Sequence, residues 1–466
     1  MSISKISLNG IAVLMLNGAL AVALFSQQPS GIPTATPDPQ IAAALHEVSP
    51  ARIQQTIEKL VSFSTRQTLS SDMPTSGGKG ATAAAKWIKS EFERYSKECG
   101  GCLEVRTDEF VQEAGPRVPK PTKITNVYAV LRGTDPANAG RMVLVTGHYD
   151  SRNSDTNDVT APAPGANDDG SGTAVSLECA RVLSQHRFPA TIIFLTVAGE
   201  EQGLYGSSHF AKMARAQGWN LEAVLNNDIV GGDRTPGDTL QDAHVVRVFS
   251  EGIPTTADEK QLKTIRALGG ENDGPSRQLA RYIASVAGEY FPPAAFHPLI
   301  VYRHDRYLRG GDHSSFNEQG YAAVRLTEYR ENYNHQHQNV RTENGIEYGD
   351  LPKFVNYDYT ANVARLNAAT LASLASAPAP PANARLLTKD LQNDSTLVWE
   401  PSPGGLATGY EVLWRDTAAP DWQHALQVEN LTRVTVPVSK DNAVFAVRAL
   451  DAKGHRSLAI VPVPER

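Results

Sequence analysis

Short, uninterrupted apolar runs followed by loops with charged residues recur in the first two thirds of the chain. Residues 142–146 and 191–197 are rich in β-branched and other apolar side chains, and such loops follow them at Gly147 and Ala198. Runs of this kind are typical of strands that are buried on both faces of a parallel sheet. Because the loops after the carboxyl ends of such strands meet in one crevice, we expect their polar residues to lie close together.

Helical patterns alternate with these strands. Strands are expected over residues 125–131, 142–146, 191–197, 223–225, 245–249 and 321–326. Helices are expected over residues 50–61, 81–95, 170–183, 207–216, 276–286 and 357–374. This alternation predicts an α/β fold class with a largely parallel sheet.

The chain of 466 residues is too long for one compact core, and its composition divides it into segments. A positive start and an apolar stretch predict a signal peptide. After the α/β part, an Ala/Pro-rich stretch predicts a linker, and period-two patterns beyond it predict a small all-β sandwich. The expected segments are a signal peptide at 1–26, a flexible lead-in at 27–45, the α/β domain at 46–374, the linker at 375–383 and the sandwich at 384–466.

Charge and cysteine content narrow the class of protein. The net charge of −6 and the pI near 6.1 give no basic footprint for nucleic acid. No second apolar stretch follows the signal, so the mature protein is expected to be secreted or periplasmic and to lack an integral membrane span. In an exported protein Cys99 and Cys102 can form a disulfide, whereas a redox pair would need a strand-to-helix context that their Gly-rich turn lacks. Cys179 has the spacing of a buried helix residue.

The loops after the apolar runs carry residues that suit a divalent metal. His148, Asp168, Glu201, Asp228 and a histidine further along the chain are the candidate ligands. Imidazole nitrogen and carboxylate oxygen suit Zn²⁺ or, less specifically, Mn²⁺ or Co²⁺. One catalytic zinc needs only three protein ligands, so five ligands indicate two ions that share one carboxylate and one water. Two dications, three carboxylates and one hydroxide would leave such a centre neutral.

Two further carboxylates have roles that their positions predict. Glu200 and Glu201 are neighbours at a strand-to-loop junction, so their side chains should point in different directions. Glu201 can then bind metal while Glu200 acts as the general base. Asp150 lies two residues after His148 and can accept the second ring N–H of that histidine, which would fix its tautomer.

Signatures of competing enzyme classes, GxSxG, HExxH and GxxxxGK[ST], are missing from the sequence. In the order of its motifs the chain resembles the M28 family of di-zinc aminopeptidases over about residues 50 to 375. The resemblance implies a three-layer sandwich with a mixed, largely parallel sheet. It implies that Asp168 bridges both metals, that His148 and Asp228 complete one site, and that Glu201 and a distal histidine complete the other. It also implies a cis peptide after Asp168.

The distal histidine is assigned by its spacing within the segment 332–339, NYNHQHQN. The family usually has a Tyr-His-Thr-Pro-x-Asp-like segment here. His335 lies four residues before Asn339, where the family often has Asp, and is therefore chosen as the ligand. His337 stays open as the alternative, because register alone does not decide between them.

The resulting expectation is an exported exopeptidase that uses two zinc ions to remove N-terminal residues from peptides with a free N-terminus. A glutaminyl-cyclase-like enzyme would use one zinc and would not need the full ligand set. An inert binding protein on the same fold would be free to lose Glu200 and Glu201. The C-terminal part resembles a fibronectin type III module, through Trp399 before Pro401 and the 409–412 strand. This module is expected to act as a spacer or to attach the protein to a surface or matrix.

Overall fold

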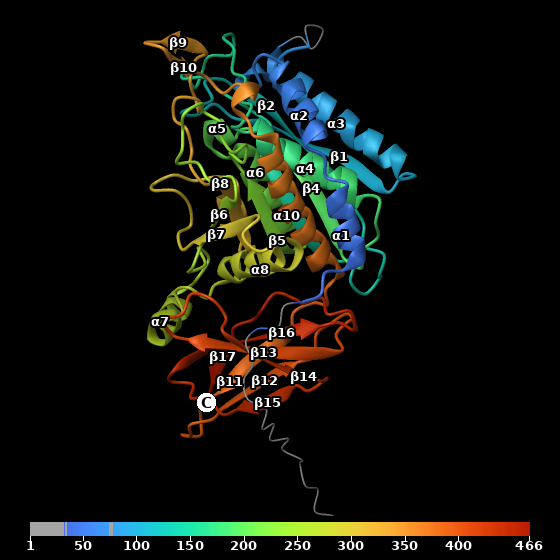
Figure 1. The fold of residues 1–466 in the computed structure, drawn as a ribbon, viewed down its shortest axis with the longest axis vertical. Helices are drawn as coiled ribbons and strands as arrows, with labels where there is room; N and C mark the ends of the chain where they lie inside the picture. Colours follow the sequence, from blue (N-terminus) through green and yellow to red (C-terminus); the bar gives the residue numbers. More distant parts are fainter. Residues whose placement is uncertain (1–31, 33–34, 74–77) are drawn as a thin grey trace, which may run out of the picture.

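A computed structural model describes residue 32 and residues 35–73 and 78–466 (Figure 1). The predicted signal peptide lies outside the described residues. In the part of the chain that is described, no helix is both long enough and apolar enough to cross a membrane.

The first domain is built on an eight-stranded sheet of order β1-β2-β4-β3-β5-β8-β6-β7. The pairs β3/β4, β3/β5, β5/β8 and β6/β7 are parallel, and the others are antiparallel. The sheet is therefore mixed and largely parallel, as predicted. Its strands are β1 (Leu103–Gln112), β2 (Thr122–Leu131), β3 (Arg141–His148), β4 (Thr191–Val197), β5 (Asn220–Asn227), β6 (Val245–Ser250), β7 (His297–Val301) and β8 (Ala323–Glu328).

Helices cover both faces of this sheet (Figure 1). Val143 and Val145 of β3 belong to a core that includes residues of α1, α2, α3, α4, α8 and α10, whereas Leu144 belongs to a second core with residues of α6 and α9. The alternation along β3 shows that the two cores lie on opposite faces, so the domain has three layers. The helices are α1 (Pro39–His46), α2 (Pro50–Val61), α3 (Ala81–Glu98), α4 (Gly170–Leu183), α5 (Glu200–Gly203), α6 (Tyr205–Ala216), α7 (Glu259–Leu268), α8 (Pro275–Tyr290), α9 (His313–Asn317) and α10 (Tyr357–Ser376).

This domain also contains short 3₁₀ helices and a small hairpin outside the main sheet. They are the 3₁₀ helices η1 (Thr68–Asp72) and η3 (Pro352–Phe354) and the hairpin strands β9 (Arg341–Glu343) and β10 (Ile346–Tyr348). The hairpin follows the segment that carries the two candidate distal histidines. It lies at the same end of the domain as α5 (Figure 1).

The C-terminal part is a small all-β domain with two antiparallel-rich sheets, β15-β12-β11-β17 and β14-β13-β16. Alternate residues of its strands, among them Leu397, Trp399 and Val412, form one buried core. This domain lies at the other end of the first domain from α5 (Figure 1). Its strands are β11 (Ala382–Leu387), β12 (Ser395–Glu400), β13 (Gly409–Asp416), β14 (His424–Val428), β15 (Arg433–Val436), β16 (Ala443–Leu450) and β17 (Val463–Glu465).

The connection between the domains differs from the predicted 375–383 linker. Helix α10 continues to Ser376, and Ala377 and Ala379 are buried. The buried guanidinium of Arg141 pairs with Glu222 at 2.7 Å and donates to the backbone carbonyl of Ala377 at 2.7 Å. The Ala/Pro-rich stretch is therefore a fixed, packed connection, since its carbonyl groups are bound by an arginine that the local composition does not reveal.

Side-chain contacts also join the two domains. Arg415 of β13 pairs with Asp273, in the loop before α8, at 2.8 Å. Arg281 of α8 pairs with the same carboxylate at 3.2 Å and donates to the backbone carbonyl of Pro420 at 2.8 Å. These side chains are almost completely buried, so the contact is a built interface between the domains.

The predicted flexible lead-in, 27–45, is wrong for its last part, because residues from Pro39 onward form α1. Asp38 caps this helix by accepting from the backbone N–H of Gln40, and proline stands at the first helical position. The apolar side chains of Ile41 and Leu45 are buried in the core of the first domain.

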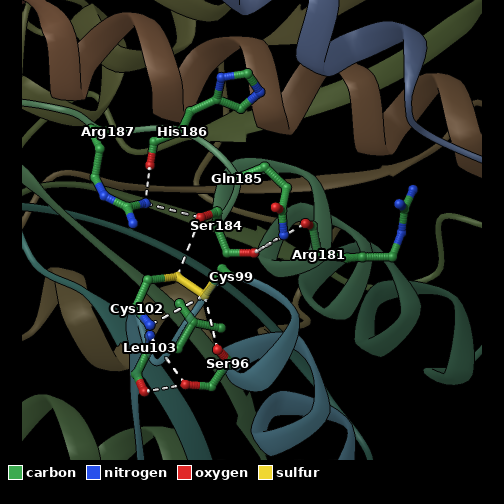
Figure 2. The surroundings of a disulfide bond; sticks show 9 residues. All are labelled: Ser96, Cys99, Cys102, Leu103, Arg181, Ser184, Gln185, His186 and Arg187. Carbon is green, nitrogen blue, oxygen red and sulfur yellow. Dashed lines mark hydrogen bonds between the residues drawn. A yellow bond between two sulfur atoms is a disulfide. The ribbon is translucent and has the colours of Figure 1, made fainter.

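Cys99 and Cys102 form a disulfide between the end of α3 and the start of β1 (Figure 2). Gly100 and Gly101 have φ values of 76° and 86°, a region that glycine adopts without strain and that allows the tight turn. Cys179 is free and buried in α4, as predicted.

Candidate metal centre

The candidate ligands come from the carboxyl ends of three neighbouring parallel strands. His148 is the last residue of β3, Asp228 follows β5 directly, and Glu200 and Glu201 begin α5 after β4. Asp168 lies in the loop that leads into α4. The crevice expected from the strand pattern therefore exists, and the five residues meet in it.

Two groups of side chains lie close enough to hold a cation each. His148, Glu200 and Asp228 form one group, and Asp168, Glu201 and His337 form the other, with ligand atoms within 4.8 Å of one another in each group. Asp168 links the groups, because its Oδ1 lies 3.2 Å from Nε2 of His148 and its Oδ2 lies 2.9 Å from Nε2 of His337.

The donor atoms fit a pair of divalent cations. Nε2 of His148 is buried and has no hydrogen-bond partner among the described residues, which is costly unless a cation or a proton donor occupies the space before it. Asp228 Oδ1 lies 3.9 Å from this nitrogen, and Glu201 Oε1 lies 3.0 Å from Nε2 of His337. Imidazole nitrogens and carboxylate oxygens in this arrangement match the ligand preference of zinc.

The structure corrects the choice of the distal histidine. His335 lies away from the other candidate ligands, because its Nδ1 pairs with Asp233 and its ring stacks on Phe354 with centroids 3.7 Å apart. The next turn of the chain, with His337 at φ 55°, carries His337 to Asp168 and Glu201 instead. Spacing did not separate the two histidines, since the partners that hold His335 are distant in sequence.

The neighbouring glutamates point to different places, as expected. Glu201 faces His337, and its second oxygen pairs with Arg152 at 2.9 Å. Glu200 lies with His148 and Asp228. Burial, together with the nearby charges of Asp228 and Glu201, raises the pKa of Glu200 well above its usual value, while His148 opposes this shift.

Asp150 holds the ring of His148 from behind. Nδ1 of His148 lies 3.1 Å from the backbone carbonyl of Asp150 and 3.4 Å from its Oδ1. A proton on Nδ1 donates to the backbone carbonyl and leaves Nε2 free to bind a cation. The carboxylate is fixed in turn, since its Oδ2 accepts from Thr68 Oγ1 at 2.8 Å and from the backbone N–H of Glu201 at 3.3 Å.

Burial lowers the pKa of His148, but the carboxylates of Asp150, Asp168 and Asp228 outweigh it, and the pKa lies well above its ordinary value. The protonated ring is thus favoured in the absence of cations. A positive charge at Nε2 lies close to the carboxylates of Asp168 and Asp228, which compensate it. The electrostatics of this crevice therefore favour bound cations.

Asp169, which sequence reasoning missed, ties the ligand-bearing segments together. Its Oδ2 accepts from the backbone N–H of His148 at 3.0 Å, and its Oδ1 accepts from those of Gly172 at 2.9 Å and Ile229 at 3.2 Å. One carboxylate thereby fixes the end of β3, the start of α4 and the residue after Asp228. The peptide bond between Asp168 and Asp169 is cis, as the family resemblance implies.

Arg66 and Asp350 also support the centre from outside the predicted motifs. The buried guanidinium of Arg66 donates to the carbonyls of Tyr149 and Gly165 at 2.6 and 2.7 Å. Asp350 accepts from the backbone N–H of Asp168 at 2.7 Å, and burial raises its pKa to about 7. Their sequence contexts carry no local motif, so only the folded chain reveals them.

The centre opens into a cavity of about 590 Å³. Residues of the centre form its floor, and its other walls include Arg117, the end of α5 and parts of the segments 306–310 and 333–338. No residue of the C-terminal domain lines it. The cavity is large enough for one or two amino-acid residues of a peptide.

Comparisons with known proteins agree with this geometry. Residues 126–354 match the model of Peptidase family M28. The chain is 46% identical over 431 residues to a "Probable zinc metalloprotease" of Pyrenophora teres f. teres, covering 92% of this chain and 88% of the relative. It is 47% identical over 435 residues to a protein of the same name from Pyricularia oryzae, with coverage of 92% and 85%.

Solved structures support the fold. The LapA aminopeptidase of Legionella pneumophila superposes with a TM-score of 0.52 at 23% identity, over 75% of this chain and 78% of that chain. The identity of 46–47% to the two relatives extends over most of their length, and this establishes the family of the chain. The chain belongs to the zinc metalloproteases of peptidase family M28.

Proposed function

We propose that this protein is an exported aminopeptidase that binds two zinc ions and removes N-terminal residues from peptides. The observation that carries the proposal is the position of Asp168, whose two oxygens face two different histidines, His148 and His337. His148, Asp168 and Asp228 would hold one ion, and Asp168, Glu201 and His337 the other. Export rests on the N-terminal sequence pattern alone.

Two bound zinc ions would supply Lewis acidity for the scissile carbonyl and would lower the pKa of the attacking water. Glu200 is the residue left to move protons, because Glu201 is engaged by His337 and Arg152. Its carboxylate would accept a proton from the attacking water and deliver it to the leaving amine. Asp150 keeps His148 in the tautomer that leaves Nε2 free.

Aminopeptidase action is supported by the negative charge of the same residues. The carboxylates of Asp168, Glu200 and Glu201 line the floor of the cavity, where the α-amino group of a peptide would meet them. An acylated N-terminus lacks the positive charge and keeps only one N–H donor for these groups. LapA, which has the same fold, is described as an aminopeptidase.

The C-terminal domain would have no part in the reaction, because it supplies no residue to the cavity. We propose that it is a fibronectin type III-like module that acts as a spacer or attaches the enzyme to a surface or matrix.

The test is the hydrolysis of leucine and glutamate p-nitroanilides by zinc-loaded protein, each beside its N-acetylated form. The proposal predicts release of p-nitroaniline from the free amines only, and a loss of about 10²–10⁴-fold in kcat for Glu200→Gln. Equal cleavage of the blocked and free substrates would point to a different peptidase. Turnover that survives Glu200→Gln would remove the proposed base.

A further inference from the structure

The cavity above the metal centre has an unusual charge distribution. The acids that line it are Asp168, Glu200, Glu201 and Asp228, all of which belong to the centre itself. The arginines that line it are Arg117, Arg152, Arg306 and Arg309. Outside the centre, the described lining therefore carries positive charge and no carboxylate.

These arginines differ in whether they form ion pairs with carboxylates of the protein. Arg152 pairs with Glu201, and the largely buried Arg306 pairs with Asp305 and Glu331. Arg309 is 35% exposed and shares Glu331 through a single nitrogen at 3.2 Å. Arg117 is exposed, donates to the backbone carbonyl of Glu201 at 3.2 Å, and has no carboxylate partner among the described residues. Arg117 and Arg309 thus keep donors available at the mouth of the cavity.

The carboxylates near Arg309 do not neutralise the positive charge of the arginines around them. Glu331 is shared by Arg247, Arg306 and Arg309. Asp305 is shared by Arg306 and Arg325. Arg325 also pairs with Asp228 at 2.8 Å, so three carboxylates face four guanidinium groups. Burial alone would raise the pKa of Glu331, but the surrounding arginines lower it, so Glu331 is ionised and its charge is already fully engaged.

A second hollow of about 580 Å³ adjoins the first, because Arg306 and Tyr333 line both. Arg247 and Arg303 also line it, and Glu331 is its only acid among the described residues. The positive wall thus continues from the cavity of the metal centre into this second hollow.

We propose that the cavity selects peptides with a carboxylate group next to the scissile bond, and that Arg117 and Arg309 are the residues that bind it. The inference rests on the proposed function and names its substrate class. Guanidinium groups bind carboxylates through paired, charge-assisted hydrogen bonds, and donors that lack an internal carboxylate partner give up only hydrogen bonds to water when they do so. The carboxylate can come from the first side chain, the second side chain or the carboxyl terminus of a very short peptide.

Three pairs of peptides distinguish these sources. They are Glu-Ala-Ala amide against Gln-Ala-Ala amide, Ala-Glu-Ala amide against Ala-Gln-Ala amide, and Ala-Ala-Ala acid against Ala-Ala-Ala amide. The proposal predicts that kcat/KM favours the acidic member of at least one pair by about ten-fold, the size expected for one hydrogen-bonded charge pair. Because the arginines at the mouth are exposed, this preference should shrink as the salt concentration rises.

Variants then test the assignment to these two residues. Arg117→Gln and Arg309→Gln should each reduce the acid-to-neutral ratio by at least about three-fold, and the double variant should bring it close to one. Arg132→Gln is the matched control, since Arg132 is exposed and follows the end of β2, whereas Arg117 precedes the start of that strand. A ratio that both cavity variants leave unchanged would overturn their assignment.

Binding gives a readout that does not need turnover. In the Glu200→Gln background, calorimetric titration of the same peptides should show a lower Kd for the acidic member, and Arg117→Gln with Arg309→Gln should abolish the difference. Equal Kd and kcat/KM within all three pairs would overturn the inference while leaving the aminopeptidase proposal intact. Acidic peptides that bind more tightly but are never cleaved would support the inference and contradict the proposed activity.

Discussion

Nε2 of His337 lies 2.9 Å from Oδ2 of Asp168. The other oxygen of the same carboxylate lies 3.2 Å from His148, so one aspartate stands between two histidines that are far apart in the sequence. A single cation bound at one of these histidines would leave Nε2 of the other histidine without a cation. The arrangement therefore favours two cations that share Asp168.

Replacement of the distal histidines should separate a ligand from a packing residue. His337→Ala should lower the zinc content from about two to about one per chain, because it removes the one imidazole of the group that it forms with Asp168 and Glu201. His335→Ala should keep two zinc ions but lower the melting temperature, since it removes the stacking on Phe354 and the pair with Asp233. Elemental analysis of dialysed proteins measures the first effect and calorimetry the second. The opposite pattern would restore His335 as the ligand.

Asp169→Asn should lower the free energy of unfolding, because Asp169 links the chain segments that carry the metal ligands. The substitution replaces one acceptor oxygen by a donor that faces a backbone N–H group, of His148, Gly172 or Ile229. A lost charged hydrogen bond with an unsatisfied buried donor costs about 2–4 kcal/mol, which denaturant unfolding would measure. Asp394→Asn, at an exposed position of the C-terminal domain, is the control. Equal stability of the two variants would show that Asp169 does not tie the segments together.

Gly172→Ala should push α4 away from β5. A Cβ atom at residue 172 would lie 2.1 Å from the backbone oxygen of Asn227, directly before Asp228. Overpacking of this kind costs about 1–3 kcal/mol and should also reduce zinc affinity. Gly140→Ala, where nothing lies within 4 Å, is the matched control and should change neither quantity.

The contact between His455 and Asp38 should make stability depend on pH. Burial opposes the protonation of His455, but Asp451 at 2.7 Å and Asp38 at 3.1 Å outweigh it and raise the pKa of the imidazole. Because the folded pKa is raised, the stabilisation is fully present below the unfolded pKa of about 6.5 and is lost as the pH rises through the folded pKa.

His455→Gln should therefore lower the melting temperature most at about pH 6 and progressively less above it, by a maximum of about 2 °C. Thermal unfolding followed at several pH values measures the difference. His46→Gln, at an exposed position at the end of α1, should show no such trend. A destabilisation that grows with pH would contradict the sign of the shift.

The central strands and the candidate ligands could be predicted because the information about them is local. The β4 run of apolar residues and the α4 pattern match the observed bounds, and His148 and Glu201 lie two and four residues after the ends of such runs. Strand β1, by contrast, is an edge strand with only one buried residue and a largely polar sequence, so it has no apolar run to identify it.

The features that were missed or wrong depend on distant partners. His335 is held by Asp233, and the Ala/Pro-rich connection is held by Arg141. Arg66 supports the centre through backbone carbonyls, which carry no sequence signal. Such contacts are decided by tertiary packing, so periodicity and spacing cannot reveal them.

The most direct test of the two-zinc account is the zinc content of the wild-type protein and of Glu200→Gln, measured beside their turnover of an unblocked peptide. The account predicts about two zinc ions per chain in both proteins, with turnover in the wild type only. One zinc ion per chain in a fully active wild type would contradict the two-zinc account. A Glu200→Gln protein that loses zinc together with activity would show that Glu200 is a metal ligand and would contradict its role as the base.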